Sequence, residues 1–247
     1  MEIERLKPLS SRPHLASARR RHRVLSASAK PASRASGPAF RPHLVLFVKE
    51  PQAGRVKTRL GRGIGPTRAT QFYRHTTASV LARLGADPRW NTILAVSPDA
   101  AVWSRVWGAD LDRVSQGRGD LGRRLERVME GLPPGPVIVI GTDIPEIRPA
   151  HIAEALRRLG SADVVFGPAS DGGYWLVGLR RRPRVPKAFR AVRWSSEHTL
   201  SDTRSNLAGL EVAMLGELID VDEAADLVSV QPVVGRRILP AEFARAC

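Results

Sequence analysis

The residues best suited to chemistry stand in a short basic segment that follows an apolar run at 44–48. The segment holds four cations and a glycine, namely Lys49, Gly54, Arg55, Lys57 and Arg59. Arginine binds phosphate oxygens through paired hydrogen bonds, lysine supplies a point charge, and glycine lets the backbone approach a ligand closely. Neither a complete Walker loop nor a G-x-G-x-x-G dinucleotide fingerprint is present. We expect a phosphate-binding turn here, with an exposed basic turn as the structural alternative.

Carboxylates form the second group of candidates. Asp143 follows the apolar run 137–140 in the sequence Gly-Thr-Asp-Ile-Pro, and Asp222 lies in Asp-Val-Asp-Glu. Oxygen ligands placed after a central strand can hold a divalent cation, which would neutralise a diphosphate. Each aspartate also has a plain structural role open to it, because aspartate caps helices and forms turns.

A third loop at 167–174 reads Gly-Pro-Ala-Ser-Asp-Gly-Gly-Tyr and brings together a hydroxyl, Ser170, a carboxylate, Asp171, and the adaptable backbone of Gly172 and Gly173. Taken alone, Asp-Gly-Gly is an ordinary hairpin signal. The six histidines show no metal-ligand spacing, and no G-x-S-x-G elbow occurs. The single cysteine, Cys247, excludes a disulfide framework and a cysteine-based zinc site.

Strands and helices that alternate along the chain must position these loops. Apolar runs predict strands over 44–48, 92–96, 137–140, 164–166, 174–179 and 211–215. Amphipathic patterns and capping residues predict helices over 67–84, 99–106, 121–129, 149–160, 196–207 and 222–228. This order predicts an α/β fold with a mostly parallel sheet covered by helices on both faces. Ligands of such sheets bind beyond the carboxyl ends of the strands, so we expect the basic and acidic turns to face each other there.

Length and charge bound the organisation of the chain. It has 247 residues, 43% of them hydrophobic, and no apolar run approaches the ~18 residues that a membrane-spanning helix needs. The net charge is +15, and residues 1–42 carry ten Lys and Arg against two acids. We expect that segment to be a disordered basic leader, 43–235 to form one domain, and 236–247 to be a tail. The leader reads as an extension without function, a transit peptide or a nucleic-acid-binding arm, and the single cysteine fits a reducing, cytoplasmic compartment.

Together these motifs resemble a family of bacterial glycosyltransferase-like proteins, the arsenosugar-biosynthesis-type glycosyltransferases. The family is related to molybdenum-cofactor and phospholactate nucleotidyltransferases. The resemblance covers about residues 43–228 and rests on four ordered blocks, which are Lys49-x-Pro51-x-x-Gly54-x-x-Lys57-Thr58-Arg59-Leu60, Gly141-Thr142-Asp143-Ile144-Pro145, Gly167-Pro168-Ala169-x-Asp171-Gly172-Gly173-Tyr174 with Trp194-Ser195, and Ile219-Asp220-x-Asp222.

The resemblance implies the nucleotide-diphospho-sugar transferase fold, a three-layer α/β/α sandwich. It also implies a nucleotide under the first loop and a divalent metal, Mg²⁺ or Mn²⁺, on Asp143. The sequence departs from the aspartate-x-aspartate pattern of metal-dependent glycosyltransferases, because Gly141 stands two residues before Asp143. The second metal ligand is therefore open between Asp222 and Asp171.

The first functional hypothesis is a metal-dependent transferase that uses a nucleotide-activated sugar. Asp143 and Asp222 would hold the metal, and Asp171 would orient or deprotonate the acceptor hydroxyl. The predicted acceptor-binding residues are Ser170, Gly172, Gly173, Tyr174 and Trp194. A nucleotidyltransferase that joins an NTP to a phosphorylated small molecule and releases pyrophosphate is the first alternative, and a non-enzymatic nucleotide or nucleic-acid binder is the second. Arginines without interleaved aromatic residues argue against a nucleic-acid groove. The sugar, base, acceptor and oligomeric state are left open.

Overall fold

The computed structural model describes residues 41–108, 111–181, 185–227 and 230. The elements, in chain order, are β1 His43–Lys49, α1 Thr58–Ile64, α2 Pro66–Leu84, β2 Asn91–Ser97, the 3₁₀ helices η1 Asp99–Trp103 and η2 Arg105–Trp107, β3 Asp112–Ser115, α3 Leu121–Gly131, β4 Val137–Ile140, α4 Pro149–Arg158, β5 Val164–Pro168, β6 Tyr174–Leu179, α5 Thr199–Ser205 and β7 Val212–Met214. The predicted leader lies outside the described residues except for positions 41 and 42, and the predicted tail at 236–247 lies wholly outside them.

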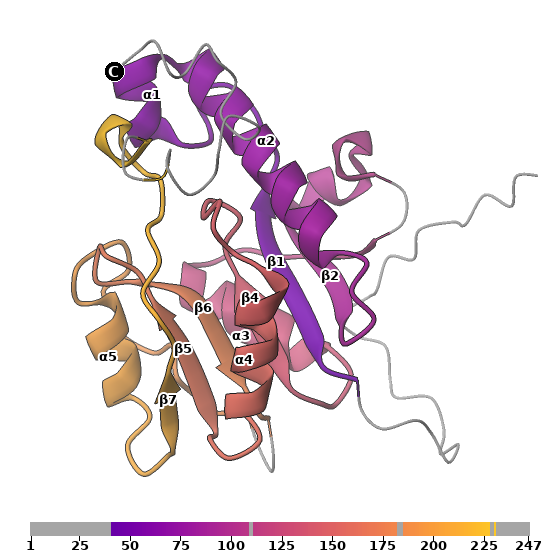
Figure 1. Ribbon diagram of the computed structural model, residues 1–247, viewed down its shortest axis with the longest axis vertical. Coiled ribbons are helices and arrows are strands. Elements are labelled where there is room, and N and C mark those ends of the chain that lie inside the picture. The colour runs from indigo at the N-terminus through magenta and orange to yellow at the C-terminus, as the bar shows by residue number, and fades with distance from the viewer. Residues whose placement is uncertain (1–40, 109–110, 182–184, 228–229, 231–247) are drawn as a thin grey trace, which may run out of the picture.

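Seven strands form one sheet in the order β3-β2-β1-β4-β6-β5-β7 (Figure 1). β1 pairs in parallel with β2 and β4, β2 pairs in parallel with β3, and β5 does so with β7. β6 runs antiparallel to both β4 and β5. The mostly parallel sheet predicted from the sequence is therefore confirmed. The carboxyl ends of the six parallel strands lie at one edge of the sheet, where the three candidate loops emerge.

Helices cover both faces of the sheet because neighbouring residues of a strand point to opposite sides. On one face Leu44 and Leu46 of β1 pack with Val80 of α2 and Ile152 of α4. On the other face Val45 belongs to a cluster with side chains of α3 and α5, namely Leu125, Val128, Met129 and Leu200. Figure 1 shows α4 in front of the sheet and α3 behind it. The result is the predicted three-layer sandwich.

A third apolar cluster joins the segment after β7 to α1. Leu60 of α1 and Phe72 of α2 are buried against Val221 and Leu227. In Figure 1 this segment runs from β7 past the strand ends up to α1. The packing holds a stretch with two aspartates next to the basic segment that precedes α1, although the two stretches lie far apart in the sequence.

Two elements differ from the sequence-based expectation in kind. β3 was not predicted, because it contains Arg113, a charged residue that is 2% exposed and donates to the backbone carbonyls of Val102 and Ser104. A buried charge within a four-residue strand hides the apolar pattern. α1 was not predicted either, because its first residues fall in the expected phosphate-binding turn; burial of Leu60 stabilises a short helix there.

Other boundaries differ in extent. The helix predicted at 99–106 forms two 3₁₀ helices, η1 and η2, and the helix predicted at 196–207 is shortened to α5. Residues 224–227 are helical within the predicted 222–228 helix, of which the last residue lies outside the described part.

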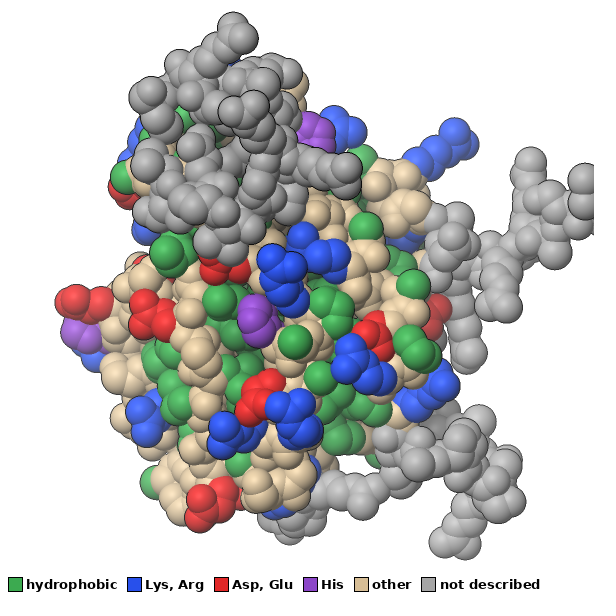
Figure 2. Space-filling model, viewed as in Figure 1, with side chains coloured by type: hydrophobic (Ala, Val, Ile, Leu, Met, Phe, Trp, Pro, Cys, Tyr) green, Lys and Arg blue, Asp and Glu red, His purple; other side chains and the backbone are tan. Residues whose placement is uncertain are grey.

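On the face that Figure 2 shows, basic and acidic side chains are interspersed rather than gathered into a patch of one sign. Within the described residues, no helix is both long enough and apolar enough to cross a membrane.

Candidate functional site at the carboxyl edge of the sheet

Two adjoining clefts lie where the candidate loops meet. The first, of about 480 Å³, is lined by the four predicted phosphate-binding cations, Lys49, Arg55, Lys57 and Arg59. We call it the basic cleft. The second, of about 310 Å³, is lined by Asp220 and by aromatic and aliphatic side chains. We call it the acidic cleft. Both clefts are lined by Asp143 and Asp171, so the two spaces share a wall of carboxylates.

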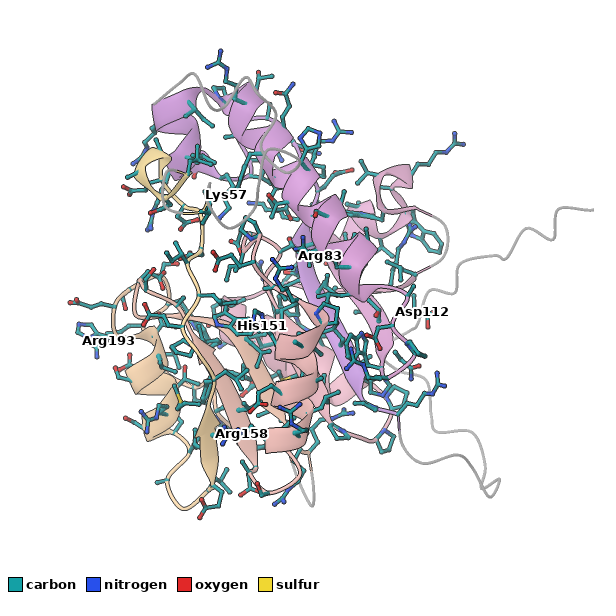
Figure 3. All side chains as sticks on the ribbon, viewed as in Figure 1. Lys57, Arg83, Asp112, His151, Arg158 and Arg193 are labelled. Atoms are coloured by element: carbon teal, nitrogen blue, oxygen red, sulfur yellow. The ribbon has the colours of Figure 1, made fainter. Side chains whose placement is uncertain are left out.

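Lys57 occupies the centre of the site. Its ammonium donates to Asp143 Oδ2 at 2.9 Å and to Asp222 Oδ1 at 2.6 Å. The Lys57 side chain is 5% exposed, whereas those of Asp143 and Asp222 are 35% and 37% exposed. The guanidinium of Arg59 lies 3.6 Å from the other oxygen of Asp222. Figure 3 shows Lys57 between α1 and the ends of the central strands. The basic segment, the loop after β4 and the segment after β7 thus meet at one nitrogen atom.

The backbone of Lys57 is strained to reach this position. Its φ of 46° and ψ of 50° are left-handed values, which a residue other than glycine adopts at a cost of about 1–2 kcal/mol. Val56 and Leu60 are buried on either side and hold the turn in place. Such strain often accompanies functional positions. Here it directs the ammonium toward the two aspartates.

The charges of this ion-pair group reinforce one another. Burial alone would lower the pKa of Lys57, but the carboxylates of Asp143 and Asp222 outweigh burial and raise it. Burial likewise opposes ionisation of Asp143, and the ammonium of Lys57 outweighs that effect and lowers the pKa of the carboxyl. Lys57 and Asp143 are therefore both charged at neutral pH.

Backbone hydrogen bonds and side chains of α2 fix the positions of the loops after β1 and β4 and of the segment after β7. The Val221 amide donates to the carbonyl of Asp143 at 3.4 Å, and the buried Val221 side chain separates Asp220 from Asp222. The Tyr73 hydroxyl accepts from the amide of Lys49 at 2.8 Å. A second residue of α2, Thr77, donates its hydroxyl to that of Thr142 at 3.2 Å.

The absence of a side chain at Gly141 has a geometric reason. A Cβ atom built on this glycine would lie 2.7 Å from Asp143 Oδ1. A side chain there would push the carboxylate away from Lys57. The departure from the aspartate-x-aspartate pattern is thus tied to the position of Asp143 itself.

The predicted acceptor residues fall into two sets. Gly173, Tyr174 and Trp194 line the acidic cleft, whereas Ser170 and Gly172 line neither cleft. Gly172 has a φ of +82°, and a Cβ there would lie 2.4 Å from the carbonyl oxygen of Glu197. Gly172 therefore packs closely against the backbone of Glu197.

Asp171 and Gly54 complete the set of predicted site residues. Asp171 lines both clefts, and its Oδ1 accepts from the amide of Gly173 at 2.8 Å. Gly54 lines neither cleft. Its φ of +73° is a value that favours glycine, so this residue serves the shape of the turn.

Sequence reasoning passed over Asp220. Burial, together with the nearby carboxylates of Asp171, Asp143 and Asp222, raises its pKa to about 6, and Lys57 partly offsets this. Four carboxylates thus influence one another at this edge of the sheet, and Lys57 pairs with two of them, Asp143 and Asp222. The signal was present in the Asp-Val-Asp spacing, which we had assigned to a single metal ligand.

Gln116 was also missed, because β3 was not predicted and the loop after it was not considered. Its Nε2 donates to the carbonyls of Val48 at 3.1 Å and Ala95 at 2.8 Å, and the residue lines the basic cleft. Ser195, which has a left-handed φ of 56°, lines both clefts. The glycines at 117 and 119 that follow Gln116 were the available signal.

A divalent cation would find few protein ligands here. Among the described residues, no group of three or more His, Cys, Asp or Glu side chains is arranged to hold a metal ion. Asp143 and Asp222 nevertheless point at one common atom, and Mg²⁺ is usually bound by only one or two carboxylates together with water and substrate phosphates. The two carboxylates therefore fit an ion that arrives with a phosphate ligand.

Comparisons with known proteins agree with this fold. The family model described as "Uncharacterized protein conserved in bacteria (DUF2064)" matches residues 80–196. A candidate nucleotide-diphospho-sugar transferase from Desulfovibrio desulfuricans G20 has 29% identity and a TM-score of 0.74, over 83% of this chain and 94% of that chain. The fold is thus that of the nucleotide-diphospho-sugar transferases.

A curated relative adds to this picture. The 2-phospho-L-lactate guanylyltransferase of Methanopyrus kandleri is 33% identical over 109 residues, which is 43% of this chain. The chain spans about half of that relative's length, 55%. The manganese complex of Rv0371C from Mycobacterium tuberculosis H37Rv has 18% identity and a TM-score of 0.50, over 79% of this chain and 100% of that chain, and shows the shared fold. The chain is therefore related to the nucleotide-diphospho-sugar transferase superfamily, as its motifs suggested, and the names of its relatives agree with the expectation of a transferase.

Proposed function

We propose that the protein is a metal-dependent transferase that moves a sugar from a nucleotide donor to a small acceptor. The convergence of Lys57, Asp143 and Asp222 in the basic cleft is the observation that carries this proposal. Cations for phosphate oxygens and carboxylates for a divalent cation lie together there. A ligand that brings both charges, a metal-bound diphosphate, matches this mixture.

The donor diphosphate is proposed to occupy the basic cleft. Lys49, Arg55 and Arg59 line it and would bind phosphate oxygens. Lys57 is already paired, so it would act by holding Asp143 and Asp222 in position and by adding positive charge beside the phosphates. Gln116 lines the same cleft with its amide nitrogen fixed by two carbonyls.

Asp143 and Asp222 would hold Mg²⁺ or Mn²⁺. When bound, such an ion supplies Lewis-acid stabilisation of the negative charge that develops on the leaving diphosphate. The two carboxylates are each about a third exposed, so they are open to an ion that enters with the nucleotide.

Asp171 is proposed to serve the acceptor. One of its oxygens is held by the Gly173 amide, and the residue faces both clefts. An acceptor hydroxyl would give its proton to Asp171 as its oxygen bonds to the anomeric carbon of the donor sugar. The bond from that carbon to the diphosphate oxygen breaks, and the nucleoside diphosphate leaves with the electron pair.

A binding screen and a product assay test the donor class. A nucleotide that binds only the folded state at a hundred times its Kd stabilises it by about 2.7 kcal/mol. We expect nucleotide-sugars with Mn²⁺ to raise the melting temperature more than either component alone, and incubation to release nucleoside diphosphate. Stabilisation by no nucleotide or nucleotide-sugar, with or without metal, would contradict the proposal.

The second candidate is a nucleotidyltransferase that releases pyrophosphate. The similarity to a named guanylyltransferase favours it. The basic cleft would then hold a triphosphate. Pyrophosphate release from GTP or another NTP, without hydrolysis of nucleotide-sugars, would select this candidate over the first.

A further inference from the structure

Charge is divided unevenly between the two clefts. The four predicted phosphate-binding cations all line the basic cleft. The described residues that line the acidic cleft include no Lys, Arg or His, whereas three carboxylates do line it, Asp143, Asp171 and Asp220. A negatively charged group that enters the acidic cleft therefore meets like charge without a compensating cation from these residues.

Most of the remaining wall of the acidic cleft is apolar, and its aromatic side chains are held in place by packing. Trp194 lies against Phe189, with ring centroids 6.3 Å apart, and a Cβ on Gly122 would come within 2.9 Å of its ring. Tyr174 packs on Phe166 at a centroid distance of 5.1 Å. These contacts indicate a preformed aromatic surface, as in binding sites for ligands with apolar or ring faces.

Resting on the proposed function, we infer that the acceptor is an alcohol that carries an apolar or ring face and no negatively charged group. Phosphate and carboxylate ligands are bound in proteins chiefly by Arg, Lys and backbone amides, and like charges brought together disfavour binding. Asp171 belongs to both clefts, so an alcohol in the acidic cleft reaches the carboxylate proposed to take its proton.

The same division of charge separates the two candidate reactions. A phosphorylated acceptor, as the nucleotidyltransferase alternative requires, would have to share the basic cleft with the triphosphate. A neutral alcohol fits the acidic cleft while the donor diphosphate lies next to it. The acceptor class thus follows from the position of the cations.

Paired probes test this inference in the whole 247-residue chain. Neutral phenyl and octyl β-D-glucosides are each compared with their 6-phosphates by isothermal titration calorimetry. Nucleotide-sugar binding with Mn²⁺ is measured in the same samples. We expect at least one neutral glucoside to bind at least tenfold more tightly than its phosphate, and Trp194→Leu to weaken that binding at least threefold.

Two carboxylate variants test whether negative charge in the acidic cleft causes the preference for neutral probes. Asp220→Asn removes one negative charge from the acidic cleft, so the preference for the neutral probe should shrink several-fold. Glu197→Gln is the matched control, because the Glu197 side chain is 81% exposed and lines neither cleft. Its preference should equal that of the unmodified protein.

The inference is overturned if a phosphate probe binds as tightly as its neutral partner, or if no neutral glucoside binds at 10 mM. It is also overturned if Asp220→Asn leaves the preference unchanged. Any of these results can occur while the nucleotide-sugar still binds, and the proposed function then stands. Failure of every nucleotide to bind contradicts the proposed function instead.

Discussion

Two cations at opposite edges of the sheet, the buried side chain of Lys57 and the half-buried Arg181, differ in the groups they bind and in what that binding does. At the carboxyl edge, Lys57 bonds to two carboxylates. At the opposite edge, just beyond β6, Arg181 donates to four backbone carbonyls, those of Gly135, Met129, Leu132 and Pro133. Both residues have left-handed φ values, 46° and 56°. Strain alone therefore does not mark a functional residue.

The partners of the two cations make the difference. Backbone carbonyls are neutral and cannot leave, so Arg181 ties the 129–135 turn to the end of β6 and keeps its charge there. The carboxylates that face Lys57 are each about a third exposed and line a cleft. A cation in that setting can respond to an anionic or metal-bound ligand. Replacing Lys57 should therefore reduce mainly activity, and replacing Arg181 should reduce mainly the free energy of unfolding.

The largest effect should follow from Asp171→Asn. A positioned general base typically contributes 10²–10⁴-fold, so transfer activity should fall on that scale. Asp171 is exposed, and its hydrogen bond to the Gly173 amide can be kept by asparagine, so unfolding free energy should change by less than ~0.5 kcal/mol. Steady-state kinetics and urea unfolding check both expectations, with Glu197→Gln as the control. Full turnover in Asp171→Asn would remove this residue from the proposed chemistry.

Lys57→Met should reduce activity by about 10²–10³-fold, the usual cost of one preorganised charge near the reacting group. It should also destabilise the fold by about 1–2 kcal/mol. That is less than the ~3–5 kcal/mol for a fully buried broken pair, because Asp143 and Asp222 keep some contact with water. Kinetics and chemical denaturation of this variant are compared with Arg62→Met, an exposed cation of α1 that lines neither cleft. Equal activity of both variants would mean that Lys57 does not act in the site as we argue.

Arg181→Met should show the opposite pattern. Its carbonyl partners lose their donor, and unsatisfied buried groups cost about 1–3 kcal/mol each, so a total loss near 3 kcal/mol is expected after partial rehydration. Activity per folded molecule should be unchanged. The neighbouring Arg180→Met removes a partly exposed pair with Asp163 and should cost less than ~1 kcal/mol. A larger loss in Arg180→Met than in Arg181→Met would reverse this assignment.

His43 should add a pH dependence at the same edge as Arg181. The residue is 5% exposed at the start of β1, and burial together with the charge of Arg181 lowers its pKa from 6.5 to about 4. The unfolded chain therefore takes up the proton first as pH falls. His43 reduces stability progressively between pH 6.5 and 4, by about 3 kcal/mol in total.

Urea unfolding at pH 7 and at pH 4.5 tests this dependence. His43→Phe should lose less stability than the unmodified protein over that interval, because phenylalanine has no proton to bind. His75→Phe, which changes an exposed histidine of α2, should follow the unmodified protein. Parallel curves for all three proteins would show that His43 is not responsible.

Much of the fold could be predicted because the central strands are buried on both faces. Runs such as 44–48 and 137–140 are apolar throughout, and only a covered parallel strand or a buried helix accommodates that pattern. The order of strands and helices then led to the sandwich, and four ordered motifs to the superfamily. Local patterns were enough for the fold class, and the superfamily came from the resemblance of the motifs to a known family.

Other features depended on contacts between distant parts of the chain. Lys57 lies 86 residues from Asp143 and 165 residues from Asp222, and only the sheet order and the packing of Val221 on α1 bring them together. The burial of Arg113 concealed β3 and with it Gln116. The separation of cations from the acidic cleft likewise arises from which loops adjoin. The sequence determined which groups are available, and tertiary packing decided which of them share one site, because electrostatic and hydrogen-bond partners are set by distance in space.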